Sequence, residues 1–176
     1  MPGYLTAALF LLSAAGVTSE RFGDWEIVCP APPAEVAAAA AAPVGVCRLQ
    51  QAQAVNGGKD VVFLFNIVLQ ADRPVAIISA PLNVYLPAGL TLRVDAGRVE
   101  RAMFESCNVS GCHAGFALGP ALLAALKRGM QLVVTLQDTK VNKIPVKVSL
   151  NGISAGLKTL SERLGAAAAG QAAGQQ

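Results

Sequence analysis

VVFLFNIVL, residues 61–69, is the most strand-like stretch of this chain. Its side chains are nearly all apolar, and β-branched and aromatic residues predominate, as in a strand that is covered on both faces. Asn56-Gly57-Gly58-Lys59 lies just before it, and asparagine and glycine tolerate the positive φ angles that tight turns require. The pattern predicts a central β-strand that is entered through a hairpin from a preceding strand at Val46–Ala54.

Short strand-like segments separated by turn residues occupy most of the remaining sequence. They are Phe22–Val28, Val75–Ser79, Leu90–Asp95, Arg98–Phe104, Gln131–Gln137 and Ile144–Leu150. Pro120–Gly129 is typical of a short helix, and Ile153–Leu164 has apolar residues at helical spacing with a stop expected at Gly165. About eight or nine strands at this spacing predict an all-β sandwich or barrel, capped by one or two short helices.

The chain of 176 residues divides into three parts. Its apolar start has the length of a signal-peptide core, so we predict a signal peptide over residues 1–19, cleaved after Ser19 or, alternatively, after Gly16. A buried N-terminal strand or helix is the other interpretation of this segment. Residues 20–164 form the predicted β domain, and residues 165–176 form a tail that we expect to be disordered. After Val17 no apolar run approaches the ~20 residues of a spanning helix, so we expect no transmembrane segment in the mature chain.

The chain contains four cysteines: Cys29, Cys47, Cys107 and Cys112. An even number in an exported chain is typical of disulfides, and proximity favours the pairs 29–47 and 107–112 among the three possible connectivities. The alternatives are a zinc site and a redox pair. Only one cysteine pair is close in sequence, no Cys-x-x-Cys occurs, and the single histidine, His113, adjoins Cys112. We therefore predict two structural disulfides, no metal, and a periplasmic or secreted location.

The sequence contains no recognisable set of catalytic or cofactor-binding residues. A hydrolytic triad needs a base beside its nucleophile, but His113 follows a predicted disulfide cysteine and no Gly-x-Ser-x-Gly is present. Gly58-Lys59 lacks the earlier glycine of a phosphate-binding loop, because Gln53 occupies that position. Scattered acids keep open a carboxylate-based enzyme or enzyme accessory that acts on envelope glycans. These acids are Asp24, Asp60, Asp72, Asp95, Glu100 and Glu105.

Charge and scaffold together favour a binding protein that is not an enzyme. The net charge is +3, and the 14 lysines and arginines are spread along the chain, whereas a nucleic-acid binder usually clusters them. The densest basic region, Lys140–Lys147, alternates with apolar residues and is interpreted as a solvated strand edge. A cross-linked β scaffold without catalytic groups predicts a protein partner, bound through exposed strand edges or hairpin loops. A carrier of an apolar ligand between the sheets is a further alternative.

The chain resembles the invasion-associated locus B family of bacterial exported proteins from about Phe22 to Leu164. The matching features are Gly23-Asp24-Trp25, Cys47 with the glutamines after it, Leu86-Pro87-Ala88-Gly89-Leu90, Cys107 and Gly111-Cys112, and Val148-Ser149-Leu150-Asn151-Gly152. The resemblance implies a periplasmic or surface-associated protein with an immunoglobulin-like β-sandwich. It also implies a partner in the envelope or on a host surface, because the family is linked with host-cell invasion in pathogens. It supplies no catalytic residues.

Overall fold

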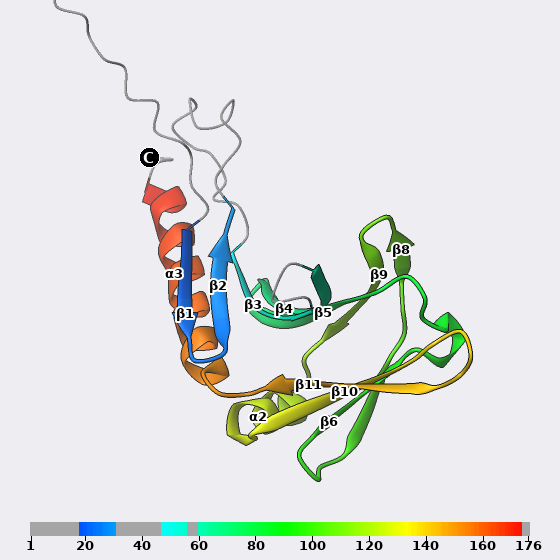
Figure 1. The fold of residues 1–176 in the computed structure, drawn as a ribbon. Helices are drawn as coiled ribbons and strands as arrows, with labels where there is room; N and C mark the ends of the chain where they lie inside the picture. Colours follow the sequence, from blue (N-terminus) through cyan, green and yellow to red (C-terminus); the bar gives the residue numbers. More distant parts are fainter. Residues whose placement is uncertain (1–17, 31–46, 56–59, 174–176) are drawn as a thin grey trace, which may run out of the picture.

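The structure is a computed structural model, which describes residues 18–30, 47–55 and 60–173 (Figure 1). These residues form two antiparallel sheets, one of seven strands and one of four. The larger sheet has the spatial order β1 (Thr18–Phe22), β2 (Trp25–Cys29), β3 (Arg48–Val55), β4 (Asp60–Gln70), β5 (Arg73–Ala80), β9 (Gly111–Ala117) and β8 (Ser106–Asn108). The smaller sheet has the order β11 (Lys143–Ser149), β10 (Gln131–Gln137), β6 (Leu90–Val94) and β7 (Val99–Ala102).

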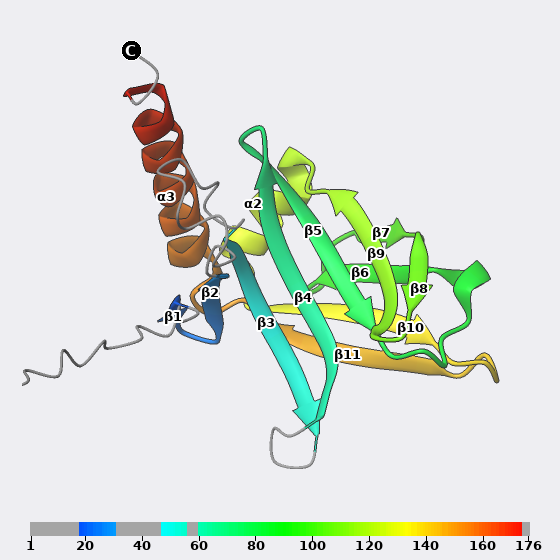
Figure 2. The same ribbon diagram turned by 90° about the horizontal axis from the view of Figure 1, so that it is seen from above.

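The helices lie at the ends of this pair of sheets. A short 3-10 helix, η2 (Leu86–Ala88), precedes β6, and α2 (Pro120–Arg128) connects β9 to β10. The C-terminal helix α3 (Ile153–Ala173) lies beside β1 and β2, as both ribbon views show (Figures 1 and 2). The protein is therefore mostly β, as predicted.

The hydrophobic core lies between the two sheets, because alternate residues of each strand point inward. The burial pattern of β10 alternates in this way, and its inward residues Leu132, Val134 and Leu136 are buried. β4, the strand predicted to be central, lies in the middle of the larger sheet and contributes the buried Phe65 and Ile67. The helices add their own apolar residues to the same core: Leu126 from α2, and Ile153, Leu157 and Leu160 from α3.

The strands of the two sheets do not run alongside one another. Seen from above, β3, β4 and β5 cross in front of β10 and β11 (Figure 2). Immunoglobulin domains pack their sheets with nearly aligned strands. The two sheets confirm the predicted two-sheet architecture. Because their strands cross, the immunoglobulin-like topology stays a prediction.

The N-terminal part differs from the predicted single strand at Phe22–Val28. The chain turns at Gly23, whose φ is +57°, so that β1 and β2 form a hairpin in which Phe22 lies opposite Trp25. Residues 1–17 of the predicted signal peptide lie outside the described residues, but Thr18 and Ser19 pair with β2. Cleavage after Ser19 would shorten β1, whereas cleavage after Gly16 would leave it whole.

The C-terminal helix is longer than predicted. Gly165 was expected to end it, but α3 continues to Ala173, so the predicted stop is wrong and the predicted disordered tail overlaps the helix. The residues after Gly165 include a run of alanine, which has the highest helix propensity of all residues. Residues 174–176 lie outside the described part.

Two disulfides cross-link the larger sheet. Cys29, the last residue of β2, is bonded to Cys47, which directly precedes β3. Cys107 and Cys112 lie opposite each other in the β8–β9 hairpin and are bonded to each other. The structure thus has the connectivity that proximity favoured, and it contains no free cysteine.

We expect the two disulfides to contribute unequally to stability. In the chain-entropy description, a bridge across a sequence separation of 18 stabilises by about 3 kcal/mol and one across a separation of 5 by about 2 kcal/mol. The double variant Cys29→Ser/Cys47→Ser should therefore lose more stability than Cys107→Ser/Cys112→Ser. Urea unfolding followed by fluorescence of the single tryptophan measures both losses. A larger loss for the short bridge would contradict the entropic explanation.

Candidate functional site

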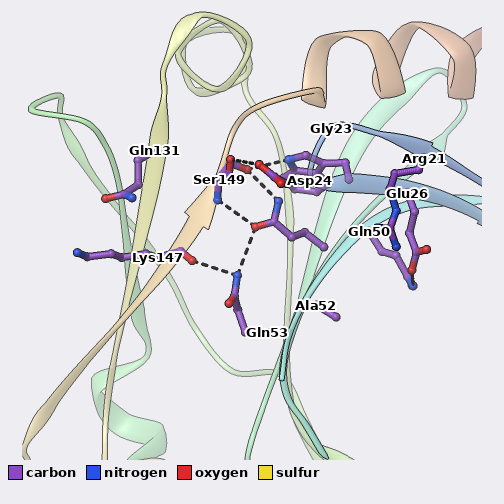
Figure 3. A pocket seen from close by; sticks show the side chains of 12 residues that line it. Arg21, Gly23, Asp24, Glu26, Gln50, Ala52, Gln53, Gln131, Lys147 and Ser149 are labelled. Carbon is purple, nitrogen blue, oxygen red and sulfur yellow. Dashed lines mark hydrogen bonds between the residues drawn. The ribbon is translucent and has the colours of Figure 1, made fainter. Parts of the chain in front are cut away.

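A polar groove of about 500 Å³ lies where β2 and β3 of the larger sheet meet β11 of the smaller one. Figure 3 shows this groove, with glutamine side chains reaching from β3 toward β11. Its lining residues are Arg21, Gly23, Asp24, Trp25, Glu26, Gln50, Gln51, Ala52, Gln53, Gln131, Lys147 and Ser149. All but three of them are polar or charged, so the groove is suited to polar ligands and not to apolar ones.

Gln51 forms the floor of the groove and holds the two sheets together. It lies on the core-facing side of β3, two residues after the fully buried Leu49, and is itself only 6% exposed. Its Nε2 donates to the carbonyl oxygen of Ser149 at 3.0 Å, and its Oε1 accepts from the backbone N–H of Ser149 at 2.9 Å. One side-chain amide thereby replaces the pair of hydrogen bonds that a neighbouring strand would make.

The exposed edge of β11 is closed in the same way along its length. Gln53 Nε2 donates to the carbonyl oxygen of Lys147 at 3.1 Å (Figure 3). Pro145, a further two residues along, has no N–H to offer. Ser149, Lys147 and Pro145 are alternate residues, so their backbone groups face the same side of the strand. Edge strands are commonly protected from pairing with other chains by side chains that cover the edge or by prolines within it.

Ser149 forms hydrogen bonds with three residues from two distant parts of the chain. Besides its two bonds to Gln51, its carbonyl oxygen accepts from Trp25 Nε1 at 2.8 Å. Its Oγ donates to Asp24 Oδ2 at 2.6 Å. The Trp25 ring is 1% exposed and packs edge-on against Phe65, with ring centroids 5.8 Å apart. The groove is therefore built on a rigid base, in which each polar group has a fixed partner.

The rim of the groove carries charges of both signs, of which Arg21 and Glu26 lie with Gln50 on the side of β2 and β3 opposite to Gln51 (Figure 3). Arg21 and Lys147 are exposed, and Glu26 Oε1 accepts from Gln50 Nε2 at 2.6 Å. Asp24 and Glu26 are the two carboxylates of the groove, and both already accept hydrogen bonds. No histidine or cysteine lines it. Chemically, the groove offers amide donors and acceptors flanked by two cations and two carboxylates.

The family model described as "Invasion associated locus B (IalB) protein" matches residues 25–161. The chain belongs to this family. The match covers every element that forms the groove except Arg21 and the β1–β2 turn, so the groove is part of the family domain.

Individual relatives agree with the family assignment. The "Invasion protein B" homologs of Brucella abortus strain 2308 and of Brucella abortus biovar 1 strain 9-941 are each 24% identical to this chain over 151 residues. Each alignment covers 85% of this chain and 83% of the relative. The crystal structure of invasion associated protein b from Bartonella henselae matches with a TM-score of 0.67 at 23% identity, over 81% of this chain and 95% of that one. The fold of this IalB-family protein is thus shared with a solved structure.

Most sequence-predicted acids of this IalB-family chain lie apart from the groove. Of the five whose side chains the structure describes, Asp24 alone lines it. Asp95 accepts hydrogen bonds from the N–H groups of Met130 and Gln131, and Glu100 forms an ion pair with Arg98. Asp72 is in the β4–β5 turn, Glu105 lies beside Gly115, and the side chain of Asp60 is outside the described part.

The remaining predicted features are placed as follows. His113 lies on the outer face of the larger sheet, where its Nδ1 shares a hydrogen bond of 2.9 Å with Ser79 Oγ. Among the described residues, no three His, Cys, Asp or Glu side chains come close enough together to hold a metal ion. No helix in the described ranges is long and apolar enough to cross a membrane. The disulfides and the IalB family indicate an extracytoplasmic protein.

Sequence reasoning missed the groove, although one signal for it is present. Gln51 and Gln53 are alternate residues of a strand, so they share a face with the buried Leu49. Amide side chains on an inward face require polar partners. That pattern could have predicted a polar contact inside the protein, but not that β11 supplies it.

Proposed function

We propose that this protein is a non-enzymatic binding protein of the envelope that holds a polar segment of a partner protein in the β2–β3/β11 groove. The observation that supports this function is the fixed network around Ser149 beneath an open groove whose rim carries Arg21, Lys147 and Glu26. Because the base of the groove is rigid, its charged and amide groups lose little conformational entropy when a partner binds. The mixed charges favour a partner segment that carries both signs.

Three further observations support binding in preference to catalysis. Asp24 and Glu26 each accept a hydrogen bond from a neighbouring side chain, so neither is arranged as an acid–base pair around an open water position. The glutamines and Pro145 occupy the β11 edge, so the partner would be recognised by side chains and not by strand addition. The names of the Brucella and Bartonella relatives connect those proteins with invasion. A host-surface protein is therefore one candidate partner, and the periplasm or the cell surface is the proposed location.

Charge reversal at the rim tests this function. Arg21→Glu/Lys147→Glu should weaken partner binding by about tenfold or more, because exposed rim charges steer and orient a charged partner. Both side chains are exposed, so the free energy of unfolding should stay within about 0.5 kcal/mol per substitution. The matched control is Arg73→Glu/Lys158→Glu, which reverses two exposed charges away from the groove.

The partner is found first by photo-crosslinking. A crosslinking amino acid at Gln50 should capture one partner from envelope extracts, and the same amino acid at Lys158 on α3 should not. Binding of that partner to the two charge variants is then measured by calorimetry. Equal capture at both positions, or equal binding by both variants, would place the binding surface elsewhere. Turnover of envelope glycans that is lost in Glu26→Gln would instead favour the carboxylate enzyme.

A further inference from the structure

A second polar surface lies on the outer face of the four-stranded sheet. Residues that pair across antiparallel strands point to the same face. The strand register therefore aligns two rows of outward side chains across the whole sheet. The rows are Lys147, Val133, Arg93 and Val99, and next to it Pro145, Thr135, Thr91 and Arg101. Lys143, opposite Gln137, extends the same face by one more position.

This face, which we call the basic face, is open to the exterior. Arg93, Arg101 and Lys143 are exposed, whereas the strand neighbours of the two arginines, Leu92 and Ala102, point into the core. α2 packs on the inner side of the sheet through the buried Leu126. Neither helix therefore covers the outer side.

A groove of about 330 Å³ runs across the basic face. Its walls combine cationic side chains with hydroxyl and amide groups, and they include no acidic residue and no aromatic one. The lining residues are Ala88, Gly89, Leu90, Thr91, Arg93, Val99, Arg101, Val133, Thr135, Gln137 and Lys143. Three cations thus converge on one concave site.

The nearest acids on the same strands do not neutralise these cations. Glu100 lies opposite the buried Leu92, so it points away from the basic face, and it pairs with Arg98. Asp95 is beyond the end of β6, where backbone N–H groups of Met130 and Gln131 bind its carboxylate. Asp138 is beyond the end of β10, where backbone N–H groups of Lys140 and Asn142 bind its carboxylate. Within the described ranges, none of the ion pairs involves Arg93, Arg101 or Lys143. The groove therefore carries an uncompensated positive charge.

We propose that the basic face binds an anionic saccharide that bears sulfate or phosphate esters. Arginine guanidinium groups bind such oxyanions through two parallel hydrogen bonds, and Arg93 and Arg101 flank the groove. Thr91, Thr135 and Gln137, which line the same groove, can hydrogen-bond to sugar hydroxyls. Single-stranded nucleic acid would need aromatic side chains on which its bases stack, and none lines the groove.

This inference is independent of the proposed partner-binding function. Arg93, Arg101 and Lys143 line only the groove on the basic face, whereas Arg21 and Gln50 line only the groove at β11. Substitutions at the two arginines therefore test saccharide binding without altering the partner site. Lys147 is left unchanged because it lines the groove at β11.

Calorimetry with the mature full chain tests the proposal at about 0.15 M salt, where weak nonspecific attraction is screened. The probes are a heparin hexasaccharide, the same hexasaccharide after desulfation, and a phosphorylated mannose oligosaccharide. We expect at least one of the two anionic saccharides to bind and the desulfated one not to bind. Arg93→Gln/Arg101→Gln should weaken that binding by about tenfold or more, since each arginine makes charge-assisted hydrogen bonds. The control Arg73→Gln/Lys158→Gln removes the same charge elsewhere and should change it less than about twofold.

Three results would overturn the proposal. The first is that neither anionic saccharide binds. The second is that the control variant loses as much affinity as the arginine variant, which would mean attraction to net charge alone. The third is that polyglutamate of equal charge binds as tightly as the saccharide, which would mean that the basic face recognises an acidic protein. Retention of the wild-type melting temperature by both variants excludes unfolding as the cause of a loss.

Discussion

Trp25→Ala will lower the free energy of unfolding by about 3–5 kcal/mol, as expected when a large aromatic side chain is removed from a core. The ring is 1% exposed, packs edge-on against Phe65, and donates from Nε1 to the carbonyl oxygen of Ser149. The substitution thus removes core contacts and one of the bonds that join the two sheets. Because this is the single tryptophan, unfolding must be followed by circular dichroism.

Trp25→Phe separates the two contributions. Phenylalanine keeps an aromatic ring against Phe65 but has no N–H for Ser149, whose carbonyl oxygen still accepts from Gln51. The expected loss is about 1–2 kcal/mol, combining a lost hydrogen bond with a small reduction in ring volume. Phenylalanine and alanine variants of equal stability would show that the indole N–H, and not packing, accounts for the effect of Trp25.

Gly152→Ala will also be strongly destabilising, by about 3 kcal/mol or more, because it combines backbone strain with a steric clash. Gly152 has a φ of +92°, and a Cβ there would lie 1.9 Å from the carbonyl oxygen of Phe22. The β1–β2 turn contacts this point directly, since the N–H of Asp24 donates to the carbonyl oxygen of Asn151 at 3.2 Å. The alanine variant must push the turn and the start of α3 apart.

Gly165→Ala is the matched control, because it makes the same chemical change inside α3, the helix that Gly152 directly precedes. An added Cβ at Gly165 meets nothing within 4 Å, and alanine is favoured over glycine in a helix by about 0.5–1 kcal/mol. Thermal unfolding should therefore show a lower melting temperature for Gly152→Ala and an unchanged or higher one for Gly165→Ala. Similar shifts in melting temperature for both variants would mean that the contact with Phe22 leaves room for a Cβ at residue 152.

Features with a local signature could be predicted from the sequence. The apolar run of β4 and the proline and glycine at the ends of α2 depend on neighbouring residues alone, and both predictions are confirmed. β3 and β4 pair as the predicted hairpin requires, although its turn residues 56–59 lie outside the described part. Proximity was also sufficient for the Cys107–Cys112 bond, whose residues lie opposite each other in a hairpin.

Features that lack such a local signature could not be predicted from the sequence. β1 is polar and exposed at four of its five positions, so it lacks the alternation that identifies a strand, and only pairing with β2 makes it one. The groove at β11 depends on contacts between residues 94 to 125 positions apart, which no local pattern reveals. The basic face has no local signature either, because Arg93 and Arg101 join Lys143 only when β6, β7, β10 and β11 align.

The hydrogen bonds of Ser149 also bear on when the molecule can fold. They connect positions 24, 25 and 51 to a residue near the C-terminus, and such non-local closure slows folding. A chain that leaves the cytoplasm N-terminus first exposes its early strands long before β11 arrives to complete them. Folding would therefore finish only after nearly the whole polypeptide has left the cytoplasm. The chain would stay unfolded during export.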